Sequence, residues 1–137
     1  MNNLLFLNKR SFVADFSWLK NLENILKKKV HLNKNISIAL VSEKEIKDLN
    51  KVYRNKNKIT DVLSFSIDSE DVLGEVLICL KQAKRQAKIN HKTNKLELQL
   101  LTTHGILHLL GYDHERSDKD ALEQERLEQE ILNILNK

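Results

Sequence analysis

The sequence predicts an α+β fold in which a small mixed β-sheet of about four strands packs with about five helices, with a metal site at the end of a central helix. In the first half of the chain, strand-like apolar segments alternate with helical patterns, and the second half is helical in pattern throughout. The length of 137 residues suits one domain, residues 1–137, whose core needs no disulfide. The lone Cys79 excludes an internal disulfide and is interpreted as a small buried hydrophobe.

Four segments have strand patterns. Residues 4–7 form a short apolar run, and apolar residues alternate with others in 35–42 and 61–67. Residues 72–80 are nearly all apolar, which predicts a strand buried on both faces at the centre of the sheet.

Five segments have helical patterns. Ser11 is expected to cap a helix that extends to about Lys29. Ser42 and Glu45 match the S-x-x-E capping box, which predicts a helix to about Tyr53. Three further helices are expected, at about 81–89, 94–110 and 118–136. One side of the second of these is expected to consist of Leu96, Leu100, Thr103 and Leu107.

The net charge of +4 is unevenly distributed. Residues 44–58 hold six basic against two acidic side chains, and residues 81–95 hold six basic and no acidic ones. Such clusters suggest a polyanionic partner, nucleic acid first, with a solvated lysine-rich helix face as the alternative. No apolar run approaches the ~18 residues that a membrane span requires, and the first residues lack a signal-peptide pattern. We therefore expect a soluble cytoplasmic protein that does not interact with membranes.

Three of the five histidines lie in THGILHLLGYDHE, residues 103–115. On a helix, His104 and His108 would project only ~40° apart and could share one metal ion. Gly111 stands where a helix commonly ends with a residue in the left-handed conformation, which glycine adopts at low cost. The chain could therefore turn back there and bring His114 to the same ion. Three imidazoles leave one position open on a tetrahedral zinc ion, as in catalytic sites. Nickel, copper or iron would also accept these ligands.

The remaining histidines, His31 and His91, have polar, lysine-rich neighbours and are interpreted as surface residues. The spacing of the three clustered ones matches the metzincin protease pattern H-E-x-x-H-x-x-G-x-x-H at every position but one. Gly105 replaces the glutamate that serves those proteases as general base. Peptide hydrolysis is therefore disfavoured, although a metal site remains expected.

The segment HGILHLLGYDH resembles the signature of the YbeY family of metal-dependent endoribonucleases. Two further segments, LNKVYRNKNKITDVLSFSI and LGEVLICL, are similar to that family's helix–arginine–strand block and to the strand after it. The resemblance extends from about Leu49 to Glu115. Where the family often has prolines around T-D-V-L-S-F, this chain has Ile59 and Ser66, which removes no reactive group.

The resemblance implies that His104, His108 and His114 bind one Zn²⁺ and that Arg54 is an active-site arginine. It also implies single-stranded RNA as substrate, with roles in maturation of the 16S rRNA 3′ end and in ribosome quality control, hence rRNA and the ribosome as partners. A guanidinium can grip a phosphate through two hydrogen bonds, although Arg54 by itself would pass for a surface residue. The candidates for holding the RNA backbone are Lys51, Lys56 and Lys58.

Other polar residues are candidates for supporting roles. Asp113 and Glu115 flank His114 and could orient a histidine ligand, with solvent exposure as the alternative. Thr60 and Asp61 open a strand and could approach the cleft, although Asp commonly caps a turn.

Two other functions remain open from the sequence. One is a zinc hydrolase acting on a substrate other than RNA, and the other is a non-catalytic ribosome assembly factor with a structural metal. A closed structural site would need a fourth ligand, and Cys79, the one thiol, lies in a predicted buried strand. The sequence indicates no particular protein partner.

Overall fold

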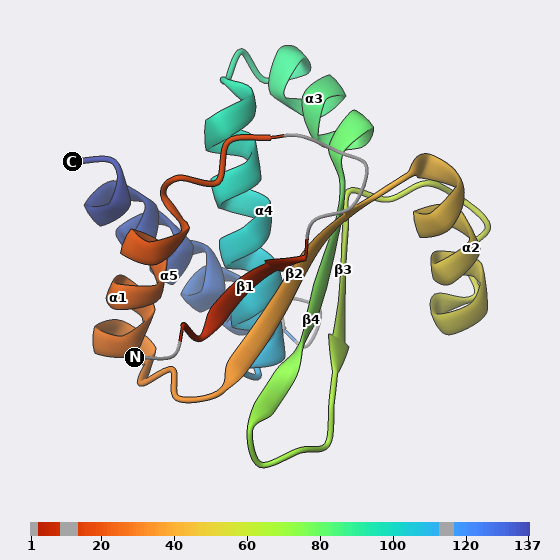
Figure 1. Ribbon diagram of the computed structural model, residues 1–137. Coiled ribbons are helices and arrows are strands. Elements are labelled where there is room, and N and C mark those ends of the chain that lie inside the picture. The colour runs from red at the N-terminus through yellow and green to blue at the C-terminus, as the bar shows by residue number, and fades with distance from the viewer. Residues whose placement is uncertain (1–2, 9–13, 113–116) are drawn as a thin grey trace.

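The computed structural model describes residues 3–8, 14–112 and 117–137 (Figure 1). In chain order the elements are β1 (Leu5–Asn8), α1 (Leu19–Val30), β2 (Asn35–Val41), α2 (Glu43–Arg54), β3 (Val62–Ser66), β4 (Val72–Cys79), α3 (Leu80–Ile89), α4 (Asn94–Leu109) and α5 (Asp118–Leu135). The strand order is β1-β2-β4-β3, with β3 antiparallel to β4 and the other pairs parallel. The predicted α+β fold with a small mixed sheet is confirmed. Within these described ranges no helix combines the length and apolar composition that crossing a membrane requires.

The sheet has helices on both faces, with α1, α4 and α5 on one side and α2 on the other (Figure 1). The predicted central position of the strand at 72–80 is confirmed, because β4 lies between β2 and β3. Its side chains alternate between two hydrophobic clusters: Val76 and Ile78 in the larger one, Leu77 and Cys79 in the smaller one. Cys79 is fully buried as predicted, and burial raises the pKa of its thiol.

The expected start of the first helix is wrong. Ser11 lies outside the described residues, but α1 begins only at Leu19. A turn precedes it, in which the Asp15 carboxylate accepts a hydrogen bond from the Ser17 N–H at 2.9 Å. The Trp18 indole N–H donates to the Asp15 carbonyl at 2.8 Å, and the ring is buried. These interactions stabilise a turn where periodicity alone predicted helix.

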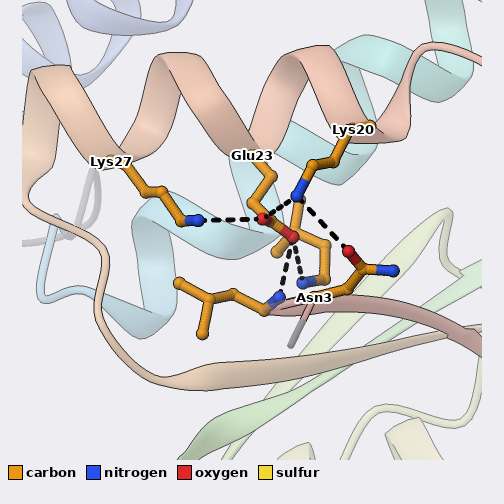
Figure 2. Close-up of polar contacts among 6 residues, drawn as sticks. Asn3, Lys20, Glu23 and Lys27 are labelled. Carbon is orange, nitrogen blue, oxygen red and sulfur yellow. Dashed lines mark hydrogen bonds and ion pairs between the residues drawn. The ribbon is translucent and has the colours of Figure 1, made fainter. Parts of the chain in front are cut away.

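Glu23 attaches α1 to the strand at the start of the chain (Figure 2). Its buried Oε1 accepts hydrogen bonds from the backbone N–H groups of Leu4 and Leu5, at 2.7 and 3.0 Å. Its Oε2 pairs with Lys20 at 2.9 Å and Lys27 at 3.2 Å. Burial opposes the charge, but these hydrogen bonds outweigh it and lower the pKa of Glu23 from 4.5 to about 2.

The capping box at the start of α2 is confirmed. The Ser42 hydroxyl accepts from the Glu45 N–H at 3.1 Å, and the Ser42 N–H donates to the Glu45 carboxylate at 3.3 Å. The helix ends at Arg54, followed by Asn55 in the left-handed conformation at φ 55°. The segment from 51 to 58 is exposed on the α2 side of the sheet.

Helix α4 is the central helix of the fold, and most of its surface is covered. It contacts β3 and β4 as well as α3 and α5. The predicted apolar side is only partly correct: Thr103 and Leu107 are buried, but Leu96 is 39% exposed. Polar residues on other sides, such as Gln99 and Thr102, are fully buried. A helix covered from several directions has no single apolar stripe, so periodicity could not identify its faces.

Candidate metal centre and the cavity beside it

The end of α4 has the turn that the sequence predicts. Gly111 has a φ of +101°, and its N–H donates to the His108 carbonyl at 3.1 Å. The Tyr112 N–H donates to the Leu107 carbonyl at 3.0 Å, which completes a Schellman motif. A Cβ at Gly111 would meet no atom within 4 Å, so the backbone conformation, rather than space, favours glycine here. Tyr112, which follows the glycine, packs against the larger core cluster.

The structure describes two of the three predicted ligands. His104 is partly buried and His108 is exposed, four residues apart on the last turns of α4. His114 lies outside the described residues, as do the neighbouring candidates Asp113 and Glu115. Among the residues that are described, no group of three or more His, Cys, Asp or Glu side chains could hold a metal ion. The three-histidine site therefore remains a prediction.

His104 has a carboxylate partner on α5. Its Nδ1 lies 2.5 Å from Glu128 Oε1, and the Gln124 side-chain amide donates to the same oxygen at 3.1 Å. The hydrogen bond with Glu128 raises the pKa of His104, against the opposing effect of burial. A carboxylate on one ring nitrogen is the usual support of a metal-binding histidine, because it fixes the tautomer and ring orientation. The arrangement fits a metal ion at Nε2, on the opposite side of the ring.

Sequence reasoning missed Glu128 and Gln124. Both lie in the segment 118–136, for which the sequence predicts only a helix, yet Glu128 is 8% exposed and Gln124 is 1% exposed. The buried positions of α5 are 124, 128 and 131, spaced by four and three residues. Polar residues on the core-facing stripe of a helix would have been the signal. Only the packing of α5 on α4 shows that this stripe faces a histidine.

A cavity of about 320 Å³ lies beside His104. Its lining consists of Asp61, Val62, Gln86, Asn90, Glu97, Leu100, Leu101, His104 and Glu128. The Gln86 side-chain amide donates to Asp61 Oδ2 at 3.1 Å and to Glu97 Oε2 at 3.0 Å, which separates the two carboxylates. Asp61 also accepts from the Val62 N–H at 2.8 Å, so it both supports the start of β3 and approaches the cleft. With three carboxylates in its lining, the cavity by itself disfavours a phosphate.

Gly105, which stands where metzincins have their glutamate, has a packing role. A Cβ there would lie 2.7 Å from Val76 Cγ1 and 3.1 Å from the Ser64 hydroxyl. The Ser64 hydroxyl also donates to the Gly105 carbonyl at 3.0 Å. Gly105 is therefore packed closely against β3 and β4, and any side chain there would require Val76 or α4 to shift. Close packing at Gly105 is consistent with the absence of a glutamate at this position.

The basic candidates lie on the other side of the sheet. Arg54 ends α2, and Lys51, Lys56 and Lys58 are exposed near it. These four residues, already close in sequence, lie on the side of the sheet opposite α4 (Figure 1). Both helices contact β3, and both run toward the lower end of the sheet in the view of Figure 1.

Cys79 does not complete a closed metal site. It belongs to the smaller cluster, on the face that α2 covers, whereas His104 projects from α4 on the opposite face. The predicted surface positions of His31 and His91 are confirmed, because both are exposed and both have φ of 56° after the ends of helices.

Comparisons with known proteins agree with the motif and the fold. A family model described as "Endoribonuclease YbeY" matches residues 6–136. A relative named endoribonuclease YbeY from Persephonella marina is 42% identical over 140 residues, covering 96% of this chain and 91% of that protein. One from Staphylococcus epidermidis strain RP62A is 36% identical over 138 residues, 88% of each chain. The solution structure of TM1509 from Thermotoga maritima superposes with a TM-score of 0.65 at 33% identity, over 96% of this chain and 88% of that one.

Proposed function

Because the chain belongs to the family described as endoribonuclease YbeY, we propose that it hydrolyses phosphodiester bonds within single-stranded RNA. The observation that carries this proposal is His104, held by Glu128 just before the glycine turn of the histidine motif. The resemblance of that motif extends the proposal to rRNA in the cytoplasm, namely 16S rRNA 3′-end maturation and ribosome quality control.

The proposed cofactor is one Zn²⁺ held by His104, His108 and His114. The donor set fits, because two imidazoles lie four residues apart on α4 and one of them has a carboxylate on its Nδ1. When bound, the ion would supply Lewis-acid activation of water at neutral pH. Asp113 and Glu115 stay candidates for orienting a ligand.

The remaining residues have separate proposed tasks. Glu128 fixes the orientation of the His104 ring, and Gln124 fixes Glu128. Arg54 donates hydrogen bonds to the phosphoryl oxygens and stabilises the charge that develops on them. Lys51, Lys56 and Lys58 contact the RNA backbone, so binding should weaken as salt rises.

The test combines metal content with RNA cleavage. Elemental analysis of the purified chain should give one metal ion, and the wild type should cleave a single-stranded RNA internally. His108→Ala should lose the metal and the activity together, while Arg54→Ala should keep the metal and lose activity by about a hundredfold or more.

Matched controls are available for both residues. His91→Asn replaces an exposed histidine in the left-handed conformation, which asparagine also adopts readily. Arg126→Ala removes an exposed arginine on α5. Both should retain wild-type cleavage. A metal-loaded wild type that cleaves no RNA would contradict the proposal, and would favour another hydrolase or an assembly factor.

A further inference from the structure

The basic segment 51–58 also exposes apolar surface. Tyr53 is 65% exposed and Val52 is 73% exposed. Four basic residues surround them, and no acidic residue occurs from 49 to 60. We call the exposed residues 51–58 the basic–aromatic segment. Basic side chains and an exposed aromatic ring therefore occur together in one short segment of the chain.

The basic–aromatic segment is held in a defined conformation. The side-chain amide of the buried Asn50 donates to the Lys58 carbonyl at 3.0 Å, and the Asn50 carbonyl accepts from the Lys56 N–H at 3.2 Å. Asn55, left-handed at φ 55°, donates its N–H to the Lys51 carbonyl at 3.1 Å. The loop after α2 is thereby folded back onto the helix. Such a surface loses little conformational entropy when it binds a ligand.

The Tyr53 ring is itself oriented. It meets Phe65 of β3 in an edge-type contact, with centroids 5.0 Å apart and planes at 67°. Phe65 is only partly buried and packs against the smaller core cluster, so it gives the tyrosine a support anchored in the sheet. The contact fixes the ring and still leaves most of it in solvent.

We propose that Tyr53 stacks on a base of single-stranded RNA while Lys56 and Lys58 contact the adjoining phosphates. This inference rests on the proposed function and names the surface that holds its substrate. The positive charge selects a polyanion, and the exposed ring selects one whose base faces are accessible, which excludes a fully paired duplex. Stacking on an aromatic side chain contributes about 1–3 kcal/mol per base.

The test separates stacking from charge through the salt dependence of binding. Fluorescence anisotropy would follow a labelled single-stranded oligoadenylate with phosphorothioate linkages, which resist hydrolysis, on the full chain across a salt series. Tyr53→Ala should raise the Kd about tenfold at every salt concentration and leave the salt slope unchanged. Tyr53→Phe keeps the ring and should stay within about twofold of wild type. Lys56→Ala should instead reduce the salt slope by about one.

Two controls protect this result. Ile89→Ala removes a side chain that is also 73% exposed and stands beside the lysines of α3, so its Kd should not change. Thermal unfolding of Tyr53→Ala shows whether loss of the Phe65 contact has disturbed the fold. In addition, ultraviolet crosslinking of the wild type to 5-bromouridine RNA, with peptide mapping, should identify Tyr53 without any substitution.

The outcomes are distinguishable. An unchanged Kd for Tyr53→Ala, or an equal loss in Tyr53→Phe, overturns stacking even if the enzyme cleaves RNA normally. Crosslinks confined to other segments overturn it as well. If the wild type neither binds nor cleaves single-stranded RNA, that result contradicts both the proposed function and this inference.

Discussion

Two glutamates on different helices, Glu23 and Glu128, are both nearly removed from solvent, yet their partners differ. Glu23 is 1% exposed and is surrounded by two backbone N–H groups and two lysines. Glu128 is 8% exposed and contacts a histidine and a glutamine. The first set stabilises an ionised carboxylate and joins two parts of the fold. The second orients an imidazole, which suggests that the same side chain serves structure on α1 and chemistry on α5.

The largest effect should come from Glu23→Gln. The difference between a pKa of about 2 in the folded chain and the ordinary 4.5 corresponds to ~3 kcal/mol of stability at neutral pH. We expect the melting temperature to fall by about 10 °C, measured by circular dichroism. Metal content and RNA cleavage of the folded fraction should stay at wild-type level. A change below about 1 kcal/mol would contradict the structural role.

Acid should reproduce this loss in the wild type. The pKa of Glu23 is lowered in the folded chain, so its contribution is present above pH 4.5 and disappears as pH falls through 4.5 toward about 2. Denaturant unfolding at a series of pH values should therefore show stability falling across this window. Glu23→Gln should show a flatter pH profile there, and parallel profiles for the two proteins would refute the assignment.

Glu128→Gln should affect the metal more than the fold. Losing the carboxylate that orients His104 should weaken metal affinity about 10- to 100-fold, measured by competition with a chelating dye. The melting temperature of the metal-free protein should change little, because an amide can still accept from Gln124. Glu125→Gln, an exposed neighbour on α5, is the matched control and should bind metal normally. Equal metal affinity in Glu128→Gln and Glu125→Gln would show that Glu128, like Glu23, has no specific role in metal binding.

The smallest effect expected is that of Gln124→Met. The substitution keeps the buried volume and removes one hydrogen bond to Glu128, which is worth ~1 kcal/mol. Metal affinity should fall about fivefold, less than for Glu128→Gln. In the double variant the two losses should not add, because the Gln124 amide nitrogen lies 3.2 Å from His104 Nδ1 as well as 3.1 Å from Glu128 Oε1, so the three side chains form one network. Additive losses in the chelator competition would show that Gln124 and Glu128 act on the metal site independently.

The sequence by itself determined the features that depend on a few neighbouring residues. The capping box at Ser42 and Glu45, the strand at 72–80 and the left-handed Gly111 follow from backbone preferences and short-range periodicity. The spacing of His104 and His108 likewise follows from the pitch of a helix. The predicted start of α1 was wrong for a local reason, because the hydrogen bonds that Asp15 makes with Ser17 and Trp18 stabilise a turn where periodicity predicts helix.

Only the tertiary structure decided which polar groups meet. His104 and Glu128 are 24 positions apart, and Asp61 and Gln86 are 25 apart. No periodicity links such positions, because the pairing depends on how α5 and α3 pack against α4 and the sheet. The apolar residues Leu127, Ile131 and Leu135 mark the covered face of α5, but they do not show which residue of another helix Glu128 meets there. Burial then makes that pairing strong, because a polar group removed from water is costly unless a partner is in place.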